Sequence, residues 1–174
     1  MKETPEYWIR ALNLKNHPEG GFFIETYRSV ETIDCNVFSK KFTGQRPLST
    51  AIYFLLMGNQ VSQFHRLKSD ELWHFYYAGS LTVHMIDQTG NYTKICLGSD
   101  HEKGEIFQTA IKKGIWLGAT VDDTESFSLV GCTVSPGFDF KDFELADQKN
   151  MLEKYPQHEL IIKKLTNTNP SQAF

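Results

Sequence analysis

The sequence SQFHRLKSDELWHFYYAG at residues 62–79 contains two strand-like runs joined by a polar turn. Successive side chains alternate between the two faces of a strand, so Gln63 and His65 are expected on one face of the first run. Glu71 opens the second run, six positions after His65, and a hairpin of that length brings the two side chains close together. On a regular strand His74 falls on the opposite face from Glu71, whereas a bulge would reverse this arrangement.

An imidazole and a carboxylate held close together support two kinds of chemistry. They bind a divalent metal ion, or they act as a general base with its orienting acid. The stretch therefore predicts a pocket with His65 and Glu71 in its wall, and both chemistries stay open. Tyr76 shares a face with His74, and His74 is equally well explained as a hydrogen-bonded barrel residue.

On either side of this stretch, the chain is a succession of short strands separated by glycine or asparagine turns. Terminal helices are expected at about 4–13, where Thr4-Pro5-Glu6 is typical of a helix start, and at 147–165. Eight or more short strands predict an all-β fold, an antiparallel barrel or jelly roll with its core at about 20–140. No repeat or linker divides the sequence, so residues 1–174 are expected to form a single domain.

Composition and charge argue against several classes of partner. The net charge is −3 and basic residues do not cluster, which argues against a nucleic-acid surface. No apolar run approaches the length of a membrane span, and the N-terminus lacks a signal-peptide core. Cys35, Cys96 and Cys132 lie far apart and are best explained as buried apolar residues. We therefore expect a cytoplasmic protein whose partner is a small molecule.

Several further residues are candidates for substrate binding. In the alternating run 22–29, Glu25 and Arg28 fall on opposite faces, so one of them is expected in a polar cavity unless the run is a solvated edge strand. Arg28 or Arg66 is suited to hold an anionic substrate group through paired hydrogen bonds. Aromatic side chains form the candidate wall of a pocket, namely Trp73, Phe75, Tyr76 and Trp116.

The run from Phe64 to Gly79 resembles the first motif of the cupin superfamily, which reads H-x-H, three or four residues, E, then a strand and a glycine. KKGIW at 112–116 resembles the start of the second motif. The segments HPEGGFFIETYRS, STAIYFL and SPGFDF, at 17–29, 49–55 and 135–140, resemble the uncharacterised Cupin_5 subfamily. The resemblance covers roughly residues 5–165. It implies a cupin-type jelly-roll barrel and a homodimer formed through an N-terminal strand and a sheet edge.

The sequence departs from the metal-binding cupin pattern at three positions. Leu67 and Leu117 stand where a metal-binding cupin places histidines, and Lys113 replaces the proline of the second motif. The resemblance leaves His65 and Glu71 as the metal ligands, with His74 or Gln63 as substitutes. No cofactor is therefore certain, and a divalent metal is the alternative.

Phe64-His65, Gly79 and residues 83–87 also resemble the metal-free sugar-nucleotide epimerases, another cupin branch. That resemblance implies His65 as the base, and Tyr27, Tyr53 or Tyr76 as the acid. The expected function is an isomerase or epimerase that acts on a sugar or a sugar-nucleotide-like substrate. A metal-assisted small-molecule enzyme and a non-catalytic binding module are the alternatives.

Overall fold

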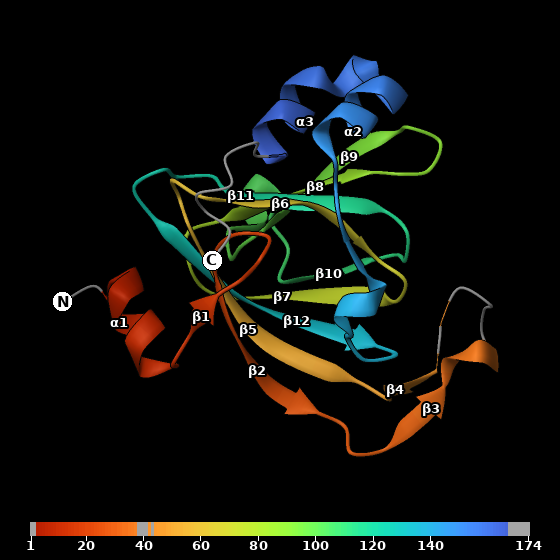
Figure 1. Cartoon of the computed structure of the whole chain (residues 1–174). Helices are drawn as coiled ribbons and strands as arrows, with labels where there is room; N and C mark the ends of the chain where they lie inside the picture. The colour runs from red at the N-terminus through yellow and green to blue at the C-terminus, as the bar shows by residue number, and fades with distance from the viewer. Residues whose placement is uncertain (1–2, 38–41, 43, 167–174) are drawn as a thin grey trace.

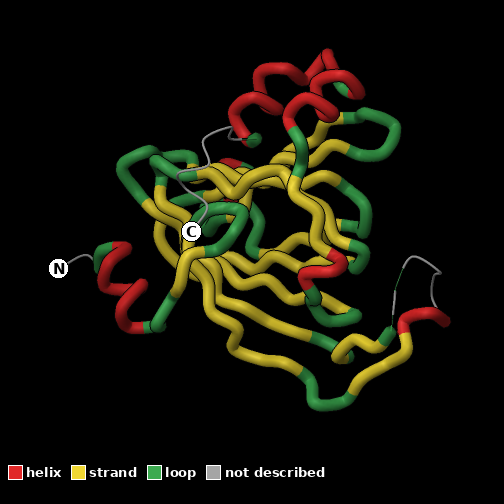
Figure 2. The backbone as a smooth tube through the Cα atoms, in the orientation of Figure 1, coloured by secondary structure: helices red, strands yellow, loops and turns green. Residues whose placement is uncertain are grey.

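The computed structural model describes residues 3–37, 42 and 44–166 of the chain. Two antiparallel β-sheets face each other and curve around a common interior, with helices at the two ends of the chain (Figures 1 and 2). The expected all-β jelly roll with short terminal helices is confirmed.

The first sheet has six strands, and adjacent strands run antiparallel. Its order is β1 (Lys15–Asn16), β2 (Phe22–Arg28), β5 (Thr50–Met57), β12 (Phe127–Ser135), β7 (Asp70–Ala78) and β10 (Gln108–Ile111). Within this sheet the central strands β5 and β12 are the most deeply buried, because both of their faces are covered.

The second sheet has five strands, in the order β13 (Phe143–Leu145), β6 (Val61–Leu67), β11 (Trp116–Val121), β8 (Leu81–Ile86) and β9 (Tyr92–Leu97). A separate hairpin of β3 (Thr32–Asp34) and β4 (Gln45–Pro47) extends away from the barrel (Figure 1). The expected hairpin between residues 61–67 and 71–78 is wrong, because β6 and β7 belong to different sheets. The turn at Lys68 and Ser69 instead carries the chain from one sheet to the other.

The main hydrophobic core fills the space between the sheets and includes Phe54, Trp73, Val83, Leu117 and Val130. The side chains alternate along each strand, so every second residue points into this space. At one end of the barrel, polar side chains replace the apolar core residues and line a pocket.

Helices cover the outer face of each sheet. Trp8 and Leu12, in and just after α1 (Pro5–Ala11), pack against the outer side of the first sheet. The helices α2 (Gln148–Lys154) and α3 (Glu159–Leu165) pack on the outer side of the second (Figure 1). Short 3-10 turns occur at Cys35–Val37, His101–Lys103, Phe140–Asp142 and Pro156–His158. Within the described part of the chain, no helix is both long and apolar enough to cross a membrane.

Candidate active site

A tight loop at residues 17–21 carries a glutamate to the end of the barrel. Gly20 has φ +110°, and a Cβ atom there would collide with the carbonyl oxygen of Val61. Only glycine therefore lets the loop lie against β6. The backbone N–H of Gln63 donates to the carbonyl oxygen of Glu19 at 2.8 Å, which fixes the loop to the strand.

A bulge in β6 determines which side chains face this loop. His65 is opposite Leu117 in the ladder with β11, but Ser62 is opposite Ala119, so β6 has one extra residue between these pairs. The extra residue interrupts the alternation of side chains. Ser62, rather than Gln63, therefore shares the pocket side with His65, and the expected common face of Gln63 and His65 is wrong.

Glu19 and His65 share one proton. The Nδ1 atom of His65 lies 2.8 Å from the carbonyl oxygen of Gln63, which only accepts, so Nδ1 carries a hydrogen. The Nε2 atom of His65 lies 3.2 Å from Oε2 of Glu19, and two lone pairs at that distance would repel each other. A proton between the two atoms removes the repulsion. Burial raises the pKa of Glu19 and lowers the pKa of His65, which favours a neutral pair.

Ser62 holds the Glu19 carboxyl group in place, and His17 holds the backbone of the same residue. The hydroxyl group of Ser62 donates to Oε1 at 2.8 Å. Nδ1 of His17 lies 3.5 Å from Oε2 and accepts from the backbone N–H of Glu19 at 3.3 Å. Burial also lowers the pKa of His17, so this imidazole is neutral. The Glu19 carboxyl group is thus oriented toward His65.

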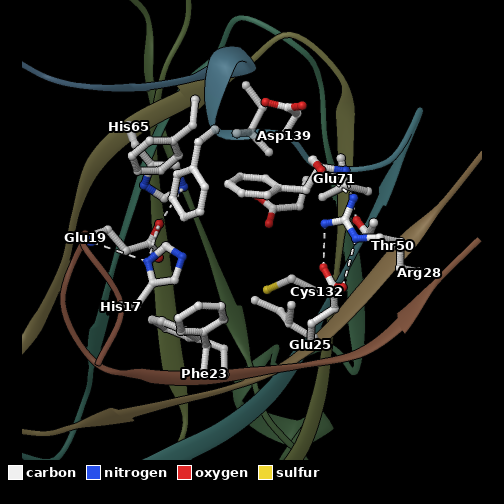
Figure 3. Close-up of a pocket in the computed structure, with 17 residues that line it drawn as sticks. His17, Glu19, Phe23, Glu25, Arg28, Thr50, His65, Glu71, Cys132 and Asp139 are labelled. Carbon is white, nitrogen blue, oxygen red and sulfur yellow. Dashed lines mark hydrogen bonds and ion pairs between the residues drawn. The ribbon is translucent and has the colours of Figure 1, made fainter. Parts of the chain in front are cut away.

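Glu71 reaches the pocket from β7, in the opposite sheet (Figure 3). Its side chain is buried, and Oε2 has no hydrogen-bond partner among the described residues. Burial raises the pKa of Glu71 to about 7, and the Glu19 carboxyl group adds to this while His65 opposes it. The neighbouring Cys132 thiol is neutral, because burial raises its pKa well above the usual value. Glu71 therefore gains or loses a proton near neutral pH.

The rim of the pocket contains an ion pair. A register shift between Glu25 and Tyr27 marks a second bulge, in β2, which brings Glu25 and Arg28 to the same face. The guanidinium group of Arg28 donates to both carboxylate oxygens of Glu25, at 2.9 and 2.6 Å, and to the carbonyl oxygen of Phe138 at 3.2 Å (Figure 3). Both side chains line the pocket, whereas strict alternation predicted only one.

The cavity has a volume of about 300 Å³, and phenylalanine is the commonest residue type in its wall. Five phenylalanines line it, namely Phe23, Phe54, Phe138, Phe140 and Phe143. Three of them come from residues 138–143 and pack edge to face against one another. A site of this size takes a compact ligand.

Four predicted site residues lie outside this pocket. His74 is on the face of β7 opposite Glu71, within hydrogen-bonding distance of Thr133 Oγ1 at 3.2 Å and of the Gln108 amide nitrogen at 2.9 Å. Tyr76 stacks on His74 and meets Tyr53 edge to face. These two tyrosines and Tyr27, which is 55% exposed, do not line the cavity. The bulge in β7 follows His74, so the regular-strand alternative for His74 holds.

Four more predicted residues have other environments. The Gln63 side chain does not line the cavity, and Trp73 is 1% exposed in the core. Arg66 donates to both carboxylate oxygens of Glu144, at 2.8 and 2.9 Å, and lies over the Trp116 ring. Trp116 packs under the C-terminal helices. The expected aromatic wall of Trp73, Phe75, Tyr76 and Trp116 is therefore wrong, since phenylalanines of other segments form it.

The main residues missed by sequence reasoning are His17 and Glu19. The segment HPEGG at 17–21 predicted only a loop. Two ionisable side chains directly before a glycine pair are the signal that was available, because such a pair lets a loop approach a neighbouring strand closely. Asp139 and the phenylalanines at 138–143 gave no comparable signal.

The pocket residues do not fit a tightly bound metal ion. Both nitrogen atoms of His65 are engaged, one with a carbonyl oxygen and the other with Glu19. Leu67 lines the cavity and Leu117 is buried in the core, so neither expected histidine position supplies a ligand. In the described part of the chain, no three histidine, cysteine or acidic side chains come together as a metal site.

A two-sheet jelly roll that encloses one pocket of buried acids and histidines is the architecture of the cupins. The chain matches the family model described as Cupin superfamily (DUF985), known as Cupin_5, over residues 6–146. The chain belongs to this family, and the resemblance inferred from its motifs is confirmed.

A yeast protein and two solved structures are similar to this chain over most of its length. An uncharacterised protein of Saccharomyces cerevisiae is 29% identical over 154 residues, which are 82% of this chain and 76% of the yeast protein. A crystal structure of a Shewanella oneidensis protein has 42% identity and a TM-score of 0.86, covering 95% of this chain and 99% of its own. A hypothetical protein from Leishmania major has 36% identity and a TM-score of 0.86, covering 94% and 98%.

A more distant neighbour shares the fold alone. Bacillus subtilis oxalate decarboxylase, which has Mn(II) centres, is 13% identical with a TM-score of 0.53. The similarity covers 88% of this chain and 38% of the decarboxylase.

Proposed function

We propose that this protein is an isomerase or epimerase that moves a proton next to the carbonyl group of a compact small molecule, such as a sugar. The observation that carries the proposal is the buried carboxyl group of Glu71, with a pKa of about 7 and an oxygen without a partner in the described residues. A general base works best when its pKa is close to the working pH. The His65–Glu19 pair supplies the second group that such a reaction needs.

In the proposed reaction, ionised Glu71 takes a proton from the carbon next to the substrate carbonyl. The proton shared by His65 and Glu19 passes to the carbonyl oxygen, which gives a neutral enediol. Glu71 then gives its proton to the neighbouring carbon or, after the enediol turns over in the pocket, to the other face of the same carbon. An enediol O–H returns its proton to the His65–Glu19 pair, which completes an isomerisation or an epimerisation. His65 thus acts with Glu19, whereas the sequence predicted Glu71 as its partner.

The test is the exchange of substrate C–H protons for solvent deuterium, followed by NMR over a panel of sugars and small ketones. Glu71→Gln and His65→Asn should each lower the exchange rate by about 10²- to 10⁴-fold, because each removes a proton-transfer group. Thermal unfolding of both variants checks that the fold is intact.

Tyr76→Phe is the matched control, because the predicted acid Tyr76 lies outside the pocket. It should keep the wild-type rate. Loss of exchange in Tyr76→Phe, or full exchange in Glu71→Gln, would contradict the proposal. Binding of a panel compound without any exchange would favour the non-catalytic binding module.

A further inference from the structure

A second cavity, of about 580 Å³, shares Leu67 and Phe143 with the acid–base pocket. Four cationic side chains line it, and we call it the basic groove: Arg66, Lys68, Lys113 and Lys141, with the amide of Gln88. Its carboxylates are Asp142 and Glu144. The groove is therefore a concentration of positive charge in a chain whose net charge is −3.

The two carboxylates are already engaged with cations. Asp142 accepts from the guanidinium group of Arg46, at 2.6 and 2.9 Å, and lies 3.2 Å from Nζ of Lys68. Asp139 also lies 4.0 Å from the guanidinium group of Arg46, so these two carboxylates together face Arg46 and Lys68. Glu144 is bound to Arg66 through both oxygens. The carboxylates do not neutralise the groove.

Two of the lysines lie outside these ion pairs, although the Asp70 carboxylate, which accepts from the backbone N–H of Lys113 at 2.9 Å, is close to one of them. Lys113 and Lys141 are exposed, and neither forms an ion pair with a residue that the structure describes. The nearby lysine Lys112 does have a partner, since it lies 2.8 Å from the carboxylate of Asp70. The unbalanced charge of the groove is therefore on these two side chains, and an anion placed between the groove walls would compensate it.

We propose that the basic groove binds a phosphate-type dianion. Lys113 and Lys141 supply point charges, and the guanidinium group of Arg66 supplies donors on its Nη1 side, which the pair with Glu144 does not use. Arg66 is held in position by Glu144 and by the Trp116 ring, whose centroid is 4.3 Å from the guanidinium carbon. This site does not use Glu71, so the proposal of an anion site is independent of the proposed reaction.

Two sources supply this chemistry: a phosphate group of the pocket's own substrate, or a free anion. The five phenylalanines of the adjoining pocket allow the sources to be separated with phenyl phosphate. If the group is part of the substrate, phenyl phosphate binds about tenfold more tightly than inorganic phosphate, and Phe23→Ala removes the difference. If the anion is free, the two dissociation constants agree within about twofold.

The primary experiment is calorimetric titration of the full chain with inorganic pyrophosphate. The double variant Lys113→Ala/Lys141→Ala should weaken binding by about tenfold or more, and added salt should weaken wild-type binding. The control Lys149→Ala/Lys163→Ala removes the same charge from lysines that pair with Glu153 and Glu159 on the C-terminal helices. It should bind like the wild type.

No saturable binding of pyrophosphate to the wild type would overturn the proposal, as would an equal loss in the two double variants. Glu71→Gln should bind pyrophosphate normally, so failure of this proposal is distinguishable from failure of the proposed reaction. Both lysines are exposed, and a thermal unfolding curve confirms that the groove variant is folded.

Discussion

At the scale of single residues, the site depends on carboxyl groups that are almost completely buried. Glu19 is 5% exposed and Glu71 is 7% exposed. An ionised carboxylate in such a place loses its hydration and needs a compensating partner. Glu19 has Ser62 and His65 for this purpose, whereas Glu71 has an oxygen without a partner in the described chain. Because of this difference, Glu19 is an acid fixed by its neighbours, whereas Glu71 is free to exchange a proton.

The raised pKa of Glu71 predicts a pH-dependent stability. In the unfolded chain the carboxyl group ionises near its usual pKa of 4.5, but in the folded chain near 7. Between these values the folded state holds a proton that the unfolded state lacks, so the free energy of unfolding falls as pH rises. Glu71→Gln should remove this decrease and stabilise the protein above pH 7, by on the order of 3 kcal/mol.

Chemical denaturation at several pH values measures this effect. Comparison of wild type with Glu71→Gln separates Glu71 from two other buried groups that both proteins contain. Glu19, whose pKa burial raises, contributes a slope of the same sign, and His65, whose pKa burial lowers, contributes a slope of the opposite sign. Identical pH dependence in the two proteins would show that folding does not raise the pKa of Glu71.

At the scale of elements, two bulges and one loop assemble the pocket. The bulge in β6 turns Ser62 and His65 to the same side, and the bulge in β2 does the same for Glu25 and Arg28. The loop at 17–21 then places Glu19 against β6. Each bulge, and the loop, departs from regular strand geometry and thereby brings two polar side chains to the same side of the pocket.

Gly20→Ala tests the loop. The new Cβ would meet the carbonyl oxygen of Val61, and φ +110° is unfavourable for alanine. Moving the loop separates Glu19 from His65, so we expect a loss of about 2–4 kcal/mol in the free energy of unfolding and a lower exchange rate.

Gly104→Ala is the matched control for this substitution. Gly104 has a φ of +79° but no atom within 4 Å of the new Cβ. It should lose about 1 kcal/mol and keep full exchange activity. If the two variants are equally stable and equally active, the close approach at Gly20 does not position Glu19.

At the scale of the whole molecule, the sheet edge next to the N-terminus is incomplete. β1 pairs only with Phe22 and Phe23, so from Ile24 onward no described strand covers the outer edge of β2. An uncovered edge is a template for pairing with another chain. The homodimer that the resemblance implied stays a prediction.

Light scattering coupled to size-exclusion chromatography tests the dimer. We expect a mass twice the 20.0 kDa of one chain. A mass of one chain over a range of protein concentrations would contradict it. Since the pocket lies within one chain, the dilution that dissociates a dimer should leave ligand binding unchanged.

Much of the fold was predictable, because strand periodicity and turn residues are local signals. The strand-like runs at 61–67 and 71–78 coincide with β6 and β7 to within one residue. His65, Glu71, Glu25 and Arg28 were also found, since an ionisable side chain in an apolar strand is conspicuous. The short strands β1, β3, β4 and β13 were missed, because two or three residues give no periodicity.

The sequence by itself determined the all-β class, the terminal helices and the family, through alternation, turn chemistry and motifs that each lie within a short segment. Only the tertiary structure decided the site. Glu19 meets His65 from a loop 46 positions earlier in the chain, and the aromatic wall comes mainly from residues 138–143. Bulges also changed which face each side chain takes, and a single inserted residue leaves almost no trace in the pattern of apolar positions. Long-range packing in the folded barrel therefore decides which charged side chains come into contact.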